Sequence, residues 1–282
     1  MLHREDPDGL IVITQPVHAW IAAQLARNWG NAQFGLFAPW EEVCLGAEQH
    51  DIGMAAWERA PTLNPKTGRP YSFMNMPTRA HVRGWREAGR LALVQGRYAA
   101  LLTSLHGTGL YEKYHDWARD TPEDAQAARD YLRDEHAFQE ELLDAIRRDP
   151  VYALYATNEA VARNRRLVAA WDRLSLALCH GVRAPVTVPD VPTADGETAL
   201  TLAPVDDDPL NVTVDPWPFH AFTVHLVCEG RRLPQTFTDE AAMRTALAAA
   251  PWVTIVTTLR KNEESGFNPK ARRARRKEEK RD

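Results

Sequence analysis

The chain has 282 residues, of which 44% are hydrophobic and 26% charged, which is ordinary for a globular protein with one sizeable core. Of its 34 basic and 38 acidic side chains, residues 270–282 hold 8 and 3, so the other 269 residues hold 26 and 35. This acidic body excludes a main surface that binds nucleic acid. No apolar run approaches the ~20 residues of a membrane-spanning helix, so we expect no membrane partner.

Three cysteines and the start of the chain bear on location. Residues 1–9 carry Asp6 and Asp8 and lack the positive flank and long apolar run of a signal peptide. Cys44, Cys179 and Cys228 cannot all pair, and none has the Cys-x-x-Cys spacing. They are typical of buried thiols in a reducing compartment, so we expect a cytoplasmic protein.

Helical periodicity dominates the first two-thirds of the chain. After the strand-like run 10–13, Thr14 and Pro16 form a typical helix start, and His18, Ile21 and Leu25 recur at helical spacing. Further helices are expected from Pro39, over about 78–95 and 97–110, in a segment that ends near Pro150, and over about 158–179.

The pattern changes after residue 184. Residues 221–228 and 252–257 alternate as strands do, and residues 239–249 form one intervening helix. We therefore predict a mainly α, essentially all-α, helical bundle over residues 1–184 with a small β-rich (α+β) unit over 185–262 packed on it. Residues 263–282 form a basic tail, which we expect to be disordered, although it could contact nucleic acid or an acidic partner.

Several of the expected helices place an ionisable side chain on an apolar face, where it costs several kcal/mol unless it is paired or binds a metal. A lone buried histidine usually bonds a carbonyl group, and a His-Asp dipeptide is weak evidence, since His115-Asp116 is a second one in a polar stretch. The conjunction carries more weight. The residues are His18, His50, Asp51, His81, His106 and Asp172. Their nitrogen and oxygen ligands suit one or two divalent transition-metal ions, Fe, Mn, Co, Ni or Zn.

The order His18, His50-Asp51, Asp172 resembles the HD-domain superfamily of metal-dependent phosphohydrolases, which has an all-helical fold. Residues 48–53 (Glu-Gln-His-Asp-Ile-Gly) look especially like its metal-binding segment, and the likeness covers about residues 10–182. His81 and His106 are placed as in members that hold two metals. More narrowly, residues 13–18, 48–53, 98–106, 171–176 and 215–219 resemble an uncharacterised bacterial family, domain of unknown function 3891, which has no known activity.

The superfamily resemblance implies a hydrolase that uses a metal-activated hydroxide on a nucleotide or other small phosphate ester. Asp51 would bridge two ions and act in catalysis with His81 and His106. Arg79 and Arg83, which flank His81, are candidate phosphate-binding residues, with Lys113 a poorer candidate. The two arginines could equally form a solvated helix face. The expected partner is therefore a small phosphorylated substrate, and the sequence gives no sign of the oligomeric state.

Other readings stay open. A di-iron oxygenase of the same fold would use the same ligands, and a binding protein could hold a structural metal. Residues 107–111 lack the Gly-Tyr-Pro signature of cyclic-dinucleotide hydrolases, and Glu135 or His136 could replace one of the ligands. The aromatic segment 215–219 could wall a substrate pocket, or fill space between the two parts of the chain.

Overall fold

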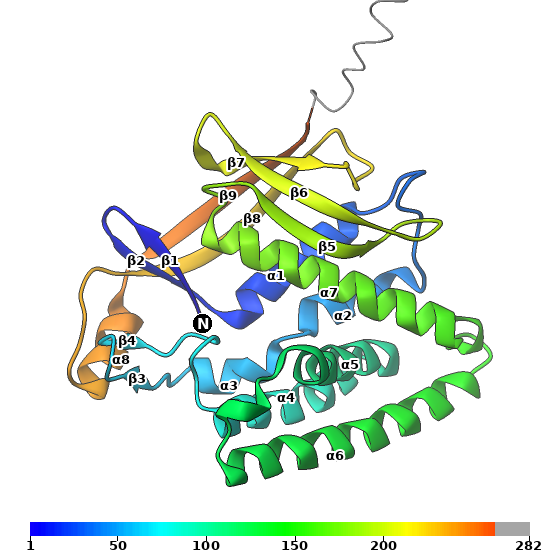
Figure 1. The fold of residues 1–282 in the computed structure, drawn as a ribbon, viewed down its shortest axis with the longest axis horizontal. Helices are drawn as coiled ribbons and strands as arrows, with labels where there is room; N and C mark the ends of the chain where they lie inside the picture. The colour runs from blue at the N-terminus through cyan, green and yellow to red at the C-terminus, as the bar shows by residue number, and fades with distance from the viewer. Residues whose placement is uncertain (263–282) are drawn as a thin grey trace, which may run out of the picture.

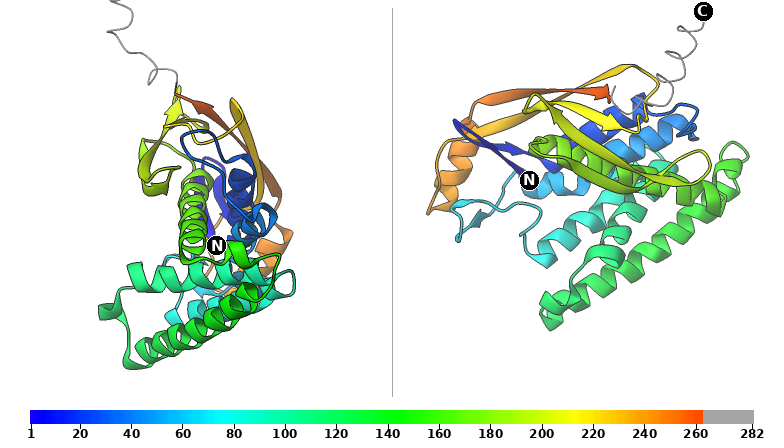
Figure 2. Two further views of the ribbon diagram at one scale, coloured as in Figure 1. Left: turned by 90° about the vertical axis from the view of Figure 1, so that its right-hand side faces the viewer. Right: turned by 45° about the horizontal axis from the view of Figure 1, so that its top comes forward.

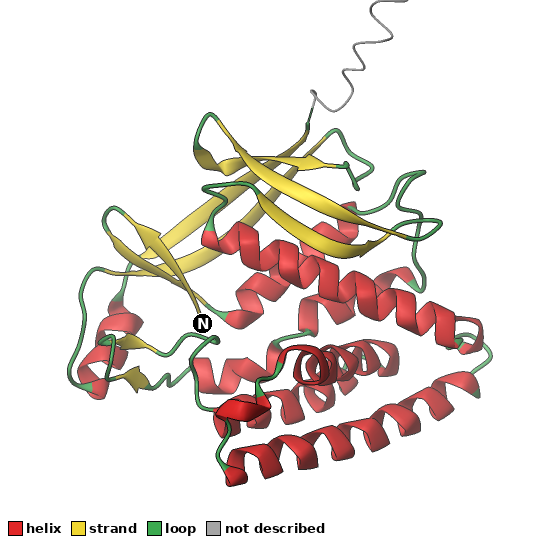
Figure 3. Ribbon diagram, in the orientation of Figure 1, coloured by secondary structure: helices red, strands yellow, loops and turns green. Residues whose placement is uncertain are grey.

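A computed structural model describes residues 1–262, in which a curled sheet lies over a group of helices (Figures 1 and 3). The helices of the described residues are α1 (Gln15–Asn28), α2 (Trp40–Gln49), α3 (Ala55–Glu58), α4 (Thr78–Leu93), α5 (Arg97–Tyr114), α6 (Pro122–Arg147), α7 (Asn158–His180) and α8 (Glu240–Ala249), with 3-10 turns η1 (Ile52–Met54), η2 (Trp117–Arg119) and η3 (Ala153–Tyr155). The strands are β1 (Leu2–Asp6), β2 (Gly9–Ile13), β3 (Leu63–Asn64), β4 (Arg69–Pro70), β5 (Val186–Pro192), β6 (Glu197–Val205), β7 (Asp208–Asp215), β8 (Thr223–Leu233) and β9 (Trp252–Lys261).

The large sheet shows that the prediction of a mainly α, all-α fold was wrong. Within residues 1–262 the sheet has seven strands in the order β1-β2-β8-β9-β7-β6-β5, and only β7 and β9 pair in parallel. The fold is therefore α+β. The error arose because β2 pairs with β8, Leu10 opposite Leu233, across more than half of the chain. No local pattern reveals such a pairing.

The sheet curls over α1 and α7, which lie between it and helices α2, α4, α5 and α6 (Figure 2). Strand β8 alternates buried and exposed residues, so that Val224, Leu226 and Cys228 face the helices. Aromatic rings join the layers, since Trp29 at the end of α1 packs against both Trp171 of α7 and Phe219. The segment 215–219 is therefore part of the core beneath the sheet.

The start of α1 and the end of α2 place their histidines. Thr14 and Pro16 begin α1 as expected, and α2 follows Pro39 and ends at Gln49, with His50 as its C-cap residue. Asp51 then leads into η1, where Gly53 lies against the backbone of α4; a Cβ on Gly53 would be 1.9 Å from the Gly84 carbonyl oxygen. This close contact between backbones fixes the turn that carries His50 and Asp51.

Two other predictions concern the C-terminal tail and membrane-spanning helices. The basic tail predicted over residues 263–282 lies outside the described residues. None of the helices within residues 1–262 combines the length and the apolarity that crossing a bilayer requires.

Candidate metal centre

Five ionisable side chains from four helical segments meet beneath the sheet. They are His18 of α1, His50 and Asp51 at the end of α2, His106 of α5 and Asp172 of α7. Each is at most 6% exposed. Because α1, α2, α5 and α7 pack on one another, residues more than 150 positions apart in the sequence come into contact.

The interatomic distances in this cluster match a set of metal ligands. Nε2 of His18 lies 3.1 Å from Nε2 of His50, 3.2 Å from Oδ1 of Asp172 and 3.3 Å from Oδ2 of Asp51. Nε2 of His50 lies 3.4 Å from Oδ1 of Asp172 and 3.8 Å from Oδ2 of Asp51. A tetrahedral ion with metal–ligand bonds of about 2.1 Å separates its ligand atoms by about 3.4 Å. The ligand atoms are thus spaced as they would be around a single cation.

Hydrogen bonding alone does not account for this arrangement. An imidazole nitrogen carries at most one proton, so Nε2 of His18 cannot donate to Asp51 and Asp172 and also to His50. Moreover, Nδ1 of His18 and Oδ1 of Asp51 are buried and have no hydrogen-bond partner among residues 1–262. Because buried polar atoms are normally paired, Oδ1 of Asp51 is available to bind an ion in the cluster, whereas an ion bound to Nε2 of His18 would leave Nδ1 of that ring as it is.

Neighbouring groups orient two of the side chains. Nδ1 of His50 donates to the carbonyl oxygen of Ala47 over 2.7 Å, which leaves its Nε2 as a lone-pair donor directed into the cluster. Gln15 donates from its side-chain nitrogen to Oδ2 of Asp51 over 3.0 Å, and its backbone nitrogen donates to Glu58. Such outer contacts are typical of metal-binding histidines and carboxylates.

The two carboxylates favour positive charge on His50, whereas burial keeps His106 neutral. Burial lowers the pKa of His50, but the charges of Asp51 and Asp172 more than offset this and raise the pKa to about 9. Burial tends to raise the pKa of Asp172, yet hydrogen bonds from His18 and His50 hold it well below its usual range. The pKa of Asp51 is raised, chiefly by burial. Burial lowers the pKa of His106 to about 3, so this ring is neutral at physiological pH.

A cavity of about 400 Å³ opens beside the cluster, and Asp51, His106 and Asp172 of the cluster are among the residues that line it. We call it the aromatic cavity, because rings make up much of its wall. The other residues that line it are Gln15, Phe73, Met74, Met76, Thr78, His81, Trp85, Leu110, Tyr111, Tyr114, His115, Asp116, Arg119, Asp120 and Leu176. A volume of this size suits a small organic molecule.

The structure does not bring every predicted site residue to the cluster. His81 lines the aromatic cavity, but Trp85 donates to its Nε2 over 2.9 Å, and the Tyr111 hydroxyl lies 3.4 Å from its Nδ1. Among residues 1–262, the groups that could hold an ion are His18, His50 and Asp51, and His50, His106 and Asp172. Neither group includes His81.

The two arginines predicted to bind phosphate lie elsewhere. Arg79 is exposed and pairs with Asp124 over 2.9 Å, and Arg83 is exposed; neither lines the aromatic cavity. The alternative ligands also have other partners, since Glu135 accepts a hydrogen bond from Ser104 over 2.6 Å and His136 pairs with Glu112 over 2.8 Å.

Gln15 is the main residue that the sequence reading missed. It lies three positions before His18, hence one turn earlier on the same face of α1, and it holds Asp51. A polar amide at that spacing from a buried histidine was a usable signal. Trp85 had a similar signal, since it follows His81 by four residues on α4.

A family profile described as "Protein of unknown function (DUF3891)" matches residues 1–235. The chain belongs to the DUF3891 family. The narrower of the two resemblances is thereby confirmed. The match includes all five residues of the cluster in this DUF3891 protein and ends just after β8. Neither a curated protein nor a solved structure matches the chain.

Proposed function

We propose that this DUF3891 protein is a metal-dependent hydrolase that acts on a small phosphate ester. One divalent transition-metal ion would be held by His18, His50, Asp51 and Asp172. The observation that carries the proposal is the spacing of these ligand atoms, 3.1–3.8 Å between neighbours, beside a cavity of about 400 Å³. The ordered resemblance to HD-domain phosphohydrolases supports phosphate esters as the substrate class.

A single ion fits the side chains better than two. The two candidate ligand groups share His50, whose Nδ1 is bonded to Ala47, so only its Nε2 is free to bind an ion. A second ion, bound toward the aromatic cavity, would need His81 as a ligand. Nε2 of His81 would first have to lose the hydrogen bond that Trp85 donates to it. This observation also weighs against a di-iron oxygenase, which needs a second set of ligands.

The ion, His106 and the aromatic side chains would each have a separate role in the reaction. When bound, a divalent ion supplies a Lewis acid and lowers the pKa of a coordinated water towards about 7. His106 borders both the cluster and the aromatic cavity, with its Nε2 3.9 Å from Oδ2 of Asp172. As a neutral ring it can hold a proton at one nitrogen and orient a substrate oxygen. The rings of Trp85, Tyr111 and Tyr114 would bind a flat or apolar part of the substrate and exclude water.

Elemental analysis combined with a phosphatase screen tests the proposal. The wild-type protein should contain about one equivalent of a transition metal and should release phosphate from at least one phosphate ester in the screen. Asp51→Ala should lose both properties while its far-UV circular dichroism is largely retained. Asp195→Ala is the matched control, because Asp195 is exposed in the turn between β5 and β6.

Two results would overturn the proposal. Full metal retention by Asp51→Ala would contradict the assignment of these side chains as metal ligands. Two equivalents of iron together with oxygen-dependent turnover and no phosphate release would replace hydrolysis with oxygenation.

A further inference from the structure

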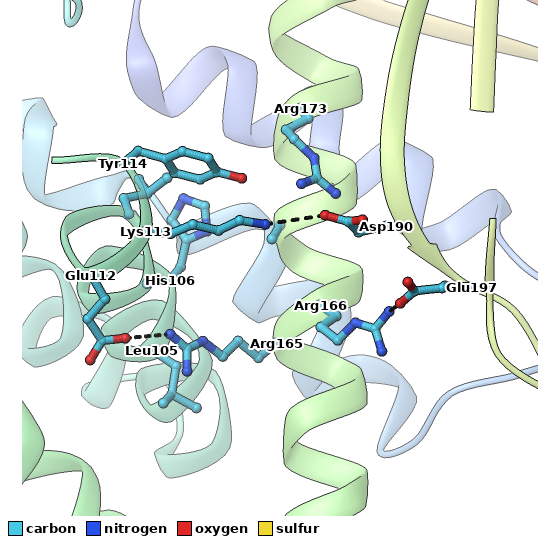
Figure 4. A pocket seen from close by; sticks show the side chains of 13 residues that line it. Leu105, His106, Glu112, Lys113, Tyr114, Arg165, Arg166, Arg173, Asp190 and Glu197 are labelled. Atoms are coloured by element: carbon cyan, nitrogen blue, oxygen red, sulfur yellow. Dashed lines mark hydrogen bonds and ion pairs between the residues drawn. The ribbon is translucent and has the colours of Figure 1, made fainter. Parts of the chain in front are cut away.

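A second hollow of about 540 Å³ lies between α5 and α7, with residues of β5 and β6 along one side (Figure 4). We call it the α5–α7 recess. His106, Leu110 and Tyr114 line both this recess and the aromatic cavity, so the two hollows adjoin. The recess therefore begins at a residue of the candidate metal centre.

Four cationic side chains and the three carboxylates of Glu112, Asp190 and Glu197 line the recess, a small positive excess that contrasts with the acidic body of the protein. Lys113 comes from α5, and Arg165, Arg166 and Arg173 come from α7. Arg165 and Arg173 are eight residues apart, which places them two turns apart on one face of the helix. Asp172, the neighbour of Arg173, contributes to the candidate metal centre. One helix thus supplies both a proposed ligand and the adjoining positive charge.

Arg173 differs from the other three cations of the recess in having no carboxylate partner among residues 1–262. Lys113 pairs with Asp190 over 3.2 Å, Arg165 with Glu112 over 3.1 Å, and Arg166 with Glu197. Arg173, by contrast, makes no ion pair with a carboxylate of residues 1–262. It donates from Nη2 to the carbonyl oxygen of Pro189 over 2.7 Å, and its buried Nε has no partner there. Its guanidinium points into the recess near the Lys113–Asp190 pair (Figure 4).

Two local features hold cations at this place. Gly109 follows His106 by about one turn of α5, and a Cβ there would lie 2.7 Å from Nη2 of Arg165, so the missing side chain lets the guanidinium lie against the helix. Asp190, the partner of Lys113, has a φ of 57° at an irregularity in the pairing of β5 with β6. Asp is one of the non-glycine residues that adopt this conformation most readily, as Asp206 and Asp207 also do.

We propose that the α5–α7 recess binds an anionic group of the substrate, a phosphate or a carboxylate, with Arg173 as the principal contact. Lys113 and Arg165 would be recruited from exposed ion pairs, which contribute little and exchange partners easily. If the hydrolase proposal holds, the substrate is a small molecule with two anionic groups, one at the metal centre and one in the recess. The recess would then take the role first expected of Arg79 and Arg83.

Anion binding can be measured without the metal, which separates this proposal from the hydrolase. The full chain, stripped with EDTA and dialysed, is titrated with pyrophosphate and with succinate by calorimetry. Arg173→Gln removes a charge-assisted contact, which is stronger than a hydrogen bond between neutral groups. Arg173→Gln should therefore weaken binding of the preferred anion by about tenfold or more, and Lys113→Gln should weaken it less. Binding should also weaken as salt is added.

The matched control is Arg133→Gln, since Arg133 is an exposed arginine of α6 paired with Asp130 and Asp134. It should bind the anion as the wild type does. Thermal unfolding of each variant shows whether it is folded. If Arg173→Gln does not fold, Lys113→Gln still tests the proposal, because Lys113 is exposed. Tighter binding of pyrophosphate or of succinate identifies the anion as phosphate-like or carboxylate-like.

Absence of binding of both anions to the wild type would overturn the recess proposal and leave the metal centre untouched. Equal binding by wild type, Arg173→Gln and Lys113→Gln would also overturn it, because the anion would then bind elsewhere. Conversely, a wild-type protein that binds the anion but contains no metal would support the recess proposal and contradict the hydrolase proposal.

Discussion

Nε2 of His18 and Nε2 of His50 lie 3.1 Å apart, and neither side chain is exposed to solvent. Two imidazole lone pairs at this distance repel each other unless a proton or a cation lies between them. The carboxylates of Asp51 and Asp172, each within 3.8 Å of a histidine nitrogen, supply the negative charge that holds it there. We therefore expect a proton and a metal ion to compete for the same position.

The first prediction concerns alkaline pH. Without metal, folding raises the pKa of His50 from 6.5 to about 9, so its stabilising contribution is fully present below pH 6.5 and is lost as the pH rises through 9. The melting temperature of the EDTA-treated protein should fall over this range. The slope for one proton is at most about 1.4 kcal/mol per pH unit. The metal-loaded protein should lack this fall, because the ion replaces the proton.

Thermal unfolding between pH 6.5 and 9.5, with and without metal, measures this difference. His50→Gln, which cannot take up the proton, should flatten the curve of the metal-free protein. Parallel curves for the metal-free and metal-loaded wild type would contradict the shared position.

The second prediction concerns acid and His81. Burial lowers the pKa of His81 to about 4, so its neutral form contributes stability above pH 6.5 that is lost as the pH falls towards 4. His81→Gln should therefore make the loss of unfolding free energy in acid less steep, by up to about 1.4 kcal/mol per pH unit. Its metal content should equal that of the wild type, because Trp85 and Tyr111 already engage both ring nitrogens of His81.

Chemical denaturation at several pH values between 4 and 7, together with elemental analysis, checks both expectations. His220→Gln is the control, since His220 is exposed. A fall from two metal equivalents to one in His81→Gln would assign His81 as a ligand of a second ion.

The helices could be predicted from the sequence because their signals are local. Thr14 and Pro16 mark the start of α1, and Pro39 precedes α2, as the structure has them. The sheet could not be predicted from the sequence, because β2 joins β8 through pairs such as Leu10 and Leu233, which lie more than 200 residues apart in the sequence. Strand β2 pairs with β1 in a local hairpin, but it joins the large sheet only through β8.

The candidate site could be predicted in part for the same reason. An ionisable residue on an apolar helical stripe is a local signal, and it selected His18, His50, Asp51, His106 and Asp172, which the fold brings together. The same signal selected His81, because a stripe cannot distinguish a ligand from a ring bonded within its own helix. Arg173 gave no signal, since a lone arginine beside Asp172 looks like a solvated position until α5 and β5 enclose it.

The last prediction concerns the backbone contact that supports His50 and Asp51. A Cβ on Gly53 would lie 1.9 Å from the Gly84 carbonyl oxygen, and backbone atoms cannot turn aside as a side chain can. Overpacking of a core commonly costs 1–3 kcal/mol, and this contact is with backbone, so Gly53→Ala should lower the free energy of unfolding by about 3 kcal/mol or more. Because Asp51 lies two residues earlier in the same turn, the variant should also retain less metal at conditions where it is still folded. Denaturant unfolding and elemental analysis measure the two effects. Gly196→Ala is the matched control, since a Cβ there meets no atom within 4 Å. A Gly53→Ala protein with wild-type stability and metal content would show that the turn after α2 is not what holds Asp51 against His18.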